Sequence, residues 1–280
     1  MPPFVFNTTK SIQFGAGSLS SLGELALGTM GQRVFLVTDA GMVATGIVDK
    51  ALSHLKAAGV EVTVFSDVQA DPPEAVILTA AETARSASAE GVIGLGGGSS
   101  LDVAKLVALL AVGKEELKAV YGVGNAKGPR LPLILVPTTS GTGSEVTPIS
   151  IVTTGTSEKM GVVSPVLLPD IALLDPELTY GLPAHVTAAT GIDAMVHAIE
   201  AYASASANNN PLSRTLATQA LELMGPALLR AVQNGKDADA RADMLLGSML
   251  AGQAFANSPV AAVHALAYPL GGHFHIPHGL

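Results

Sequence analysis

The sequence predicts an α/β N-terminal domain with a parallel sheet, followed by an all-α C-terminal domain. In the first part of the chain, short β-branched runs alternate with amphipathic or Ala-rich stretches, a pattern typical of a parallel sheet covered by helices on both faces. After residue 180 the strand signals cease, and long stretches rich in Ala, Leu and Met indicate helices. We therefore expect domains at 1–180 and 181–280, in a chain whose 280 residues can bury a sizeable core.

Strands and helices are expected in alternation along the first domain. The run 33–38, RVFLVT, predicts a strand that ends at Asp39–Gly41. The run 91–95, GVIGL, has no charged residue and predicts a strand buried within the sheet. The other strands are expected at 60–66 and 132–136, with helices at 43–58, 73–88 and 100–112.

Helices are expected throughout the second domain, after a boundary near Gly181–Pro183. Their predicted ranges are 186–204, 211–233, 238–256 and 259–268. The final stretch, 269–280, is a Pro/Gly-rich loop that contains histidines. Because a candidate metal ligand lies so close to Leu280, we expect the helical domain to be truncated at residue 280.

Composition and charge argue against several classes of protein. Lys and Arg total 15 against 23 Asp and Glu, and this net charge of −8 without a basic cluster argues against nucleic acid or an anionic membrane as partner. Apolar runs such as 106–112 are too short to cross a bilayer, and the first residues lack a signal-peptide pattern. We therefore expect a cytoplasmic protein. Because the chain has no cysteine, a metal here must be bound by His, Asp, Glu or backbone oxygen.

A glycine-rich segment at 94–105, GLGGGSSLDVAK, joins an expected strand to an expected helix. Glycines let a phosphate approach the backbone, and a helix N-terminus offers free N–H groups and a positive dipole end. The glycines at 96–98 and Ser99 are therefore candidates to hold a pyrophosphate. The alternative is a tight strand-to-helix turn capped by Ser99 or Ser100. The chain has neither GxGxxG nor GxxxxGK, so it lacks the ordinary Rossmann and P-loop fingerprints.

Two further polar features are expected at the carboxyl edge of the sheet, where ligands of open parallel sheets bind. The segment 137–148, PTTSGTGSEVTP, places many hydroxyls after a strand, although it also fits a polar surface loop. Asp39 ends the first strand, where an acid accepts hydrogen bonds from ribose hydroxyls and repels a 2′-phosphate. Asp39 therefore favours NAD over NADP, and its alternative role is to cap a helix.

A metal site is suggested by the histidines of the second domain. Asp193 and His197 are four residues apart on an expected helix, so both side chains can reach one ion. His264 lies on another apolar stretch, and His278 follows the Pro/Gly loop. One carboxylate and three imidazoles suit Fe²⁺ or Zn²⁺ better than Mg²⁺ or Ca²⁺. The alternatives are a surface Asp/His pair and hydrogen-bonded core histidines.

With these motifs assembled, the sequence resembles the iron-containing (group III) alcohol dehydrogenase family, which has a dehydroquinate synthase-like fold. The motifs are TDAG at 38–41, GGGSSLDVAK at 96–105, PTTSGTGSEVTP at 137–148, DPEL at 175–178, GIDAMVHAIE at 191–200 and HALAYPLGGHFHIPHG at 264–279. The resemblance implies an NAD-dependent enzyme that interconverts a small alcohol and its aldehyde or ketone by hydride transfer. It also implies a homodimer or higher homo-oligomer.

The resemblance also implies roles for individual residues. Metal ligation falls to Asp193, His197, His264 and His278. Cofactor binding falls to Asp39, Gly97, Gly98, Ser99, Thr138, Thr139, Thr142 and Lys159, and Asp102 and Thr147 match family positions near the cofactor. Tyr268 stands where many members have His, and this position implies a proton relay or a pocket wall.

Three other functions stay open at this point. A dehydroquinate synthase-like lyase shares the fold, the metal and NAD, but it recycles NADH, and the lack of a basic cluster weighs against a phosphorylated substrate. A maleylacetate reductase-like enzyme is a close relative that looks similar but has a different glycine-loop and histidine pattern. A non-catalytic nucleotide-binding protein would bind cofactor without metal.

Overall fold

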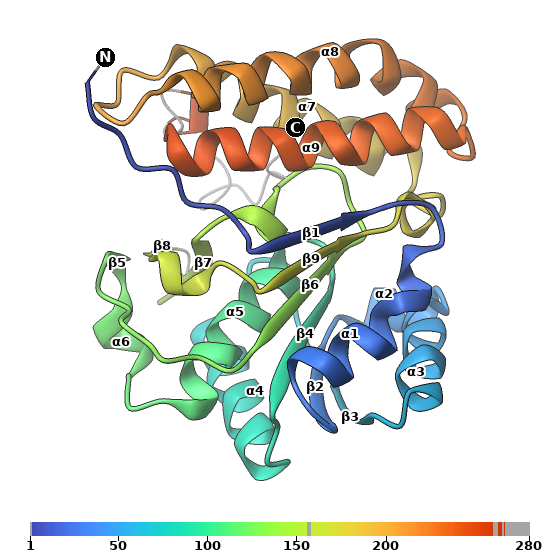
Figure 1. Cartoon of the computed structure of the whole chain (residues 1–280), viewed down its shortest axis with the longest axis vertical. Coiled ribbons are helices and arrows are strands. Elements are labelled where there is room, and N and C mark those ends of the chain that lie inside the picture. Colours follow the sequence, from blue (N-terminus) through green and yellow to red (C-terminus); the bar gives the residue numbers. More distant parts are fainter. Residues whose placement is uncertain (1, 156–157, 260–262, 265, 267–280) are drawn as a thin grey trace. The chain divides into compact units, whose positions relative to one another are not determined.

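The computed structural model describes residues 2–155, 158–259, 263, 264 and 266 (Figure 1). These residues form two compact units. The α/β unit consists of Thr9–Thr138 and Pro148–Asp175. The helical unit consists of the described residues of Met1–Thr8, Thr139–Thr147 and Pro176–Leu280. The chain thus passes from one unit to the other several times along its sequence.

A six-stranded parallel sheet forms the centre of the α/β unit, with the order β1-β9-β6-β4-β2-β3. The strands are β1 (Ser11–Phe14), β2 (Arg33–Val37), β3 (Glu61–Phe65), β4 (Gly91–Gly96), β6 (Leu133–Pro137) and β9 (Ile171–Leu174). The chain runs outward from β2 to β3 and then restarts at β4 on the other side of β2. Strand order therefore reverses between β2 and β4, which is where open α/β sheets bind their ligands.

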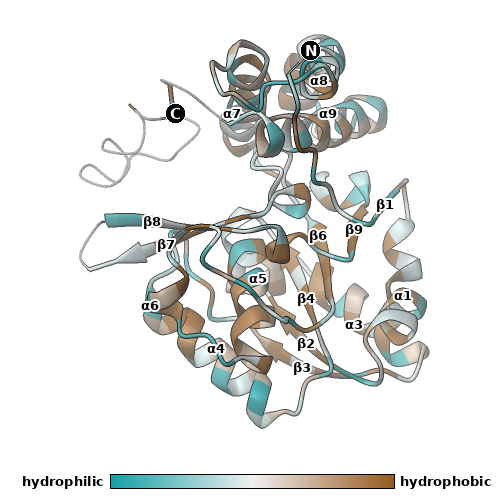
Figure 2. Cartoon of the chain, turned by 60° about the vertical axis from the view of Figure 1, so that its left-hand side comes forward, coloured by the Kyte–Doolittle hydropathy of each residue, from teal (hydrophilic) through white to brown (hydrophobic). Residues whose placement is uncertain are grey.

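Helices cover both faces of this sheet, with α4 and α5 on one face and α1 and α3 on the other (Figure 1). Their bounds are α1 (Leu22–Thr29), α2 (Ala40–Ala44), α3 (Ile47–Ala57), α4 (Glu74–Ser86), α5 (Gly98–Val112) and α6 (Leu117–Val120), with short 3-10 turns at Ser18–Ser21 and Pro165–Leu167. Figure 2 shows hydrophobic residues concentrated on the central strands and on the helices that pack against them. Most of α5 is buried because it packs against β4, β6 and α4.

A smaller sheet of the α/β unit has the order β5-β8-β7 and consists of β5 (Gly122–Val123), β7 (Ile149–Thr154) and β8 (Glu158–Val163). Two side chains of α5 bind the backbone of β7. The fully buried Lys105 donates from Nζ to the carbonyl of Ile149 at 2.6 Å, and Asp102 Oδ2 accepts from the N–H of Ile151 at 2.9 Å. The two charges also pair at 3.5 Å.

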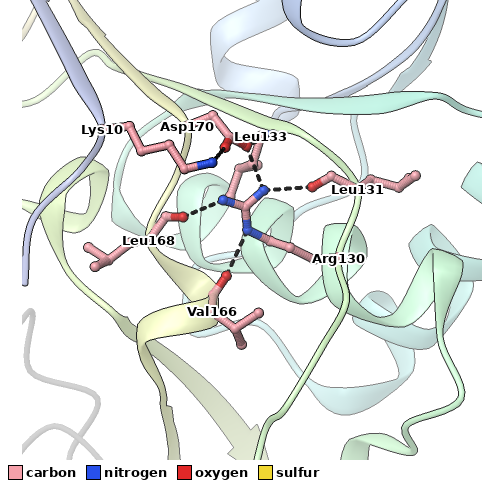
Figure 3. A network of polar contacts seen from close by, with 7 residues as sticks. All are labelled: Lys10, Arg130, Leu131, Leu133, Val166, Leu168 and Asp170. Atoms are coloured by element: carbon pink, nitrogen blue, oxygen red, sulfur yellow. Dashed lines mark hydrogen bonds and ion pairs between the residues drawn. The ribbon is translucent and has the colours of Figure 1, made fainter.

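An ionic network joins the segments that lead into β1, β6 and β9 (Figure 3). Asp170 Oδ2 accepts from Arg130 Nη1 at 2.7 Å and from the N–H of Leu133 at 3.0 Å, while Oδ1 accepts from Lys10 at 2.6 Å. The Arg130 guanidinium also donates to the carbonyls of Leu131, Val166 and Leu168. Burial raises the pKa of Asp170, but Arg130, Lys10 and the Leu133 N–H lower it more, so its pKa lies below the usual range.

Three long helices make up most of the helical unit: α7 (Ala184–Ala203), α8 (Pro211–Gln233) and α9 (Ala238–Asn257). Short 3-10 turns lie at Ser144–Val146 and Pro176–Thr179. Asn210 caps α8 by accepting from the N–H of Ser213. Helices α8 and α9 approach closely at Gly247, where an added Cβ would lie 2.4 Å from Met224 Cγ. Among the described helices, none has the length and apolarity needed to cross a membrane.

The first residues of the chain also belong to the helical unit. The N–H of Asn7 donates to Asn257 Oδ1 at 2.6 Å, across 250 residues of sequence. Gln253 donates to the hydroxyl of Thr8 at 2.7 Å, and the N–H of Val5 donates to Asn208 at 2.8 Å. The N-terminal segment is therefore held against residues that lie more than 200 positions later.

The predicted fold class is confirmed: a parallel α/β domain precedes a helical one. One expected helix, 43–58, is instead two, because Gly46 adopts φ +77° and separates α2 from α3. The sequence did not predict β1, β5, β7, β8 or β9. The expected segments 259–268 and 269–280 lie mostly outside the described residues.

Candidate functional site

One face of α7 carries three buried ionisable side chains. Asp193, His197 and Glu200 stand at positions i, i+4 and i+7, which share one side of a helix. All three are at most 8% exposed. The predicted pairing of Asp193 with His197 is therefore observed inside the protein rather than on its surface.

His264 meets this face of α7 from a segment far away in sequence. Its Nε2 lies 3.5 Å from Asp193 Oδ1, and His197 Nε2 lies 3.9 Å from the same oxygen. The rings of His197 and His264 stack at 4.5 Å, and Phe255 stacks on His197 at 4.4 Å. Phe255 belongs to α9, so the His197 imidazole stacks with rings from two other segments of the chain.

Glu200 contacts His264 on the side of the imidazole that faces away from Asp193. Its Oε2 lies 2.5 Å from His264 Nδ1, and its Oε1 accepts from the N–H of Val263 at 2.7 Å. Burial lowers the pKa of His264, but the hydrogen bonds and charges of Asp193 and Glu200 outweigh burial and raise it. The cluster therefore concentrates negative charge around two imidazoles.

The donor set fits a divalent transition metal. One donor atom each from Asp193, His197 and His264 lie within 4.8 Å of one another. Ligands that share a tetrahedral ion at ~2.05 Å lie about 3.3 Å apart. Asp193 Oδ1 lies 3.5 Å from His264 Nε2 and 3.9 Å from His197 Nε2, slightly farther than this. Imidazole and carboxylate together suit Fe²⁺ or Zn²⁺. Two other predicted residues of this site, His278 and Tyr268, lie outside the described residues.

Sequence reasoning missed Glu200, although it lies within the motif at 191–200. The only available signal was its position three residues after His197, on the same helix face. Its role depends on two partners more than 60 residues later, which spacing alone does not reveal.

In the α/β unit, Asp39 and the glycine segment lie at the carboxyl ends of β2 and β4. Asp39 caps α2 by accepting from the N–H of Met42 at 3.0 Å, and its other oxygen accepts from the hydroxyl of Ser100 at 3.1 Å. The helix-capping role that the sequence offered as an alternative for Asp39 is therefore observed. Gly96 has φ +150°, and a Cβ there would lie 2.9 Å from Ser100 Oγ, so this turn requires glycine.

Two buried threonine hydroxyls lie beside this turn. Thr38 follows β2 and Thr138 follows β6, the strands on either side of β4. Within the described part of the chain, neither hydroxyl has a hydrogen-bond partner. Buried hydroxyls normally have partners, so these two are candidates to bind a ligand or water. Gly97 and Gly98 begin α5 at the same edge of the sheet.

The remaining predicted cofactor residues are divided between the two units. Thr139, Thr142 and Thr147 belong to the helical unit, and Ser99, Asp102 and Lys159 belong to the α/β unit. The Thr142 hydroxyl accepts from the N–H of Ser144, and the Thr147 hydroxyl donates to the carbonyl of Ser144. Lys159 on β8 pairs with Asp71.

Comparisons with known proteins extend over both units. The family model "Iron-containing alcohol dehydrogenase" matches residues 9–176, and the model of the C-terminal part of the Fe-containing alcohol dehydrogenase family matches 187–280. The chain is 46% identical to Long-chain-alcohol dehydrogenase 1 of Geobacillus thermodenitrificans over 268 residues, which are 95% of this chain and 67% of the relative.

Solved structures agree with these matches. A 1,3-propanediol oxidoreductase superposes with a TM-score of 0.94 at 37% identity, over 99% of this chain and 72% of its own. The sulfoacetaldehyde reductase of Bifidobacterium kashiwanohense, solved in complex with NAD⁺, superposes with a TM-score of 0.90 at 32% identity, over 99% of this chain and 73% of its own. Together with the matched family models, these likenesses show that the chain belongs to the iron-containing alcohol dehydrogenase family of oxidoreductases.

Proposed function

We propose that this protein is a metal-dependent, NAD-linked alcohol dehydrogenase that interconverts a small alcohol and its aldehyde or ketone. The observation that carries the proposal is the buried cluster of Asp193, His197 and His264 on the helical unit. The relatives named above act on long-chain alcohols, 1,3-propanediol and sulfoacetaldehyde, so the family supports an alcohol or aldehyde substrate but varies in its identity.

In this proposal, Asp193, His197 and His264 hold Fe²⁺ or Zn²⁺, with His278 as a fourth ligand. The metal supplies Lewis acidity that lowers the pKa of a substrate hydroxyl, and NAD supplies the hydride acceptor. Asp193 provides the negative charge that offsets the charge of the ion. Phe255 covers one face of His197 and keeps water from it. Tyr268 stays a proposed proton relay or pocket wall.

The cofactor is proposed to bind at the strand-order reversal of the α/β unit. The Gly96 turn lets a pyrophosphate approach the backbone, and the N-terminus of α5 offers free N–H groups. A carboxylate has about four lone-pair positions, and Asp39 uses one oxygen for Met42 and the other for Ser100. The remaining positions can accept from ribose hydroxyls, and the charge disfavours a 2′-phosphate.

The other proposed cofactor residues are those implied by the sequence: Gly97, Gly98, Ser99, Asp102, Thr138, Thr139, Thr142, Thr147 and Lys159. A homodimer or higher homo-oligomer and a cytoplasmic location also stay proposals, and both depend on the resemblance and composition.

Metal content per chain tests the proposal directly. Wild-type protein, purified without chelators or air, is compared with His264→Ala and with His185→Ala, an exposed histidine on α7 that serves as control. We expect about one Fe or Zn per chain in wild type and control, and a loss in His264→Ala. Folded wild-type protein without metal, or equal metal in all three proteins, would overturn the ligand assignment.

Turnover separates the proposed reaction from that of a synthase on the same fold. Metal-loaded protein is incubated with NAD and a series of alcohols while absorbance follows NADH. Net NADH accumulation supports a dehydrogenase. A metal-loaded, NAD-binding protein that never reduces NAD with any alcohol, nor oxidises NADH with any aldehyde, would refute it.

A further inference from the structure

We infer that Glu200 is a positioning residue that fixes the tautomer and orientation of His264, so that its Nε2 faces the metal site. The inference rests on the proposed function, because it takes Asp193, His197 and His264 as metal ligands. The group assigned here is none of those ligands. Glu200 reaches the site through the far side of the His264 ring.

Each oxygen of Glu200 faces one N–H donor. Oε1 accepts from the N–H of Val263 at 2.7 Å, and Oε2 lies 2.5 Å from His264 Nδ1. Glu200 and His264 are both at most 5% exposed. A buried carboxylate is costly unless its oxygens are hydrogen-bonded, so both contacts are needed to keep it in place.

The identity of the acceptor fixes the tautomer of the imidazole. An ionised carboxylate only accepts hydrogen bonds, so the ring nitrogen that faces Glu200 must carry the hydrogen. His264 then has its hydrogen on Nδ1 and its lone pair on Nε2, the nitrogen 3.5 Å from Asp193 Oδ1. Metal-binding histidines commonly donate their second ring N–H to a carboxylate in this way.

Helix α7 therefore provides both ligands and the group that orients a third. Asp193, His197 and Glu200 lie along one helix face. The helix that carries two of the ligands therefore also holds the His264 ring in position. A second contact holds this segment to α7, because the buried Ser258 hydroxyl donates to the carbonyl of Ala201 at 2.8 Å. Ala201, which follows Glu200 in sequence, thus anchors Ser258, which precedes His264 in the chain.

Glutamine cannot replace Glu200 at this position. Its side chain has the same shape, but one of its two ends is an NH₂ donor. If the NH₂ faces His264, Nδ1 must accept and the hydrogen moves to Nε2, which blocks the ligand atom. If the NH₂ faces Val263, two donors oppose each other. Aspartate keeps both acceptors and the charge but is one methylene shorter.

Metal affinity without turnover tests the inference. Apoprotein is titrated with Co²⁺ and with Zn²⁺ for wild type, Glu200→Gln, Glu200→Asp and Glu222→Gln, an exposed glutamate on α8 that serves as control. Loss of such a carboxylate partner typically weakens metal binding about 10–100-fold, and we expect this range for Glu200→Gln. We expect an intermediate loss for Glu200→Asp and no change for the control.

The tautomer provides a readout that a purely structural role would not affect. Nitrogen-15 NMR of metal-free wild type, with labelled histidine and at a pH where the imidazole carries a single hydrogen, should show His264 protonated at Nδ1. A hydrogen on Nε2 of wild-type His264 would overturn the inference, and this test does not require any variant to fold. Folded Glu200→Gln that binds metal with wild-type affinity would also overturn it. If wild type binds Zn²⁺ and either of these results is found, the role of Glu200 is refuted but the proposed metal site stands. If wild type binds no metal, both the metal site and the role of Glu200 are refuted.

Discussion

The network around Asp170 predicts a large loss of stability when its charge is removed. The substitution Asp170→Asn keeps the shape of the side chain but leaves Arg130, which is 11% exposed, without its counter-ion. Removing one partner of a fully buried ion pair costs about 3–5 kcal/mol. Asp170 is 15% exposed and Arg130 keeps three carbonyl partners, so we expect a smaller loss of about 2 kcal/mol.

The pH dependence of this loss has a definite sign. The pKa of Asp170 is lowered in the folded protein, so its stabilisation is complete above the unfolded value of about 3.9. It is lost as pH falls below 3.9 through the folded pKa. The difference between wild type and Asp170→Asn should therefore be constant from pH 7 to pH 5 and shrink below pH 4.

Urea unfolding at pH 7, 5 and 3.5 measures this difference, with thermal unfolding as a second assay. A loss of about 2 kcal/mol lowers Tm by roughly 4–8 °C. Lys10→Ala is the matched control, because Lys10 binds the same carboxylate but is 79% exposed and should contribute less than ~1 kcal/mol. Equal losses in both variants, or a difference that grows as pH falls, would refute the reasoning.

Substitutions in both units, and the binding of Zn²⁺, should change coenzyme preference or stability in defined ways. Asp39→Asn keeps a good helix cap but removes the charge, so coenzyme kinetics should show a reduced preference for NAD over NADP, with Tm nearly unchanged. Gly247→Ala should cost about 1–3 kcal/mol in urea unfolding because the new Cβ overlaps Met224, whereas Gly225→Ala on α8 meets no atom within 4 Å and should not destabilise. Zn²⁺ at 100 times its Kd should stabilise wild type by about 2.7 kcal/mol in thermal unfolding but should not stabilise His197→Ala.

Each of these has an outcome that would contradict it. An unchanged coenzyme ratio in Asp39→Asn would mean that the carboxylate does not face the ribose. Equal effects at Gly247 and Gly225 would mean that the α8–α9 contact tolerates an extra methyl. Zn²⁺ stabilisation of His197→Ala would place the ion elsewhere.

Long helices could be predicted from sequence, whereas the shortest strands of the six-stranded sheet could not. Helix α8 has the predicted bounds, 211–233, because it is long and Asn210 and Pro211 mark its start. Strands β1 and β9 were missed because each has only four residues, too few for a pattern to distinguish strand from loop.

The same distinction applies to the site. Spacing alone placed Asp193 and His197 on one helix face, because a helix determines where residues four apart lie. The approach of His264 and the role of Glu200 depend on tertiary packing across 64 residues, which no local pattern encodes. The histidine pattern and the family motifs both made His264 a candidate ligand, and only the structure revealed its contact with Glu200.

The contacts of the first residues have a consequence for synthesis of the protein. Asn7 and Thr8 bind side chains of α9, yet a ribosome makes their partners about 250 residues later. At roughly 5–20 residues per second, this delay is about 12–50 s. During that time the nascent N-terminal segment has no native partner on α9, so this part of the helical unit can close only after α9 has been made.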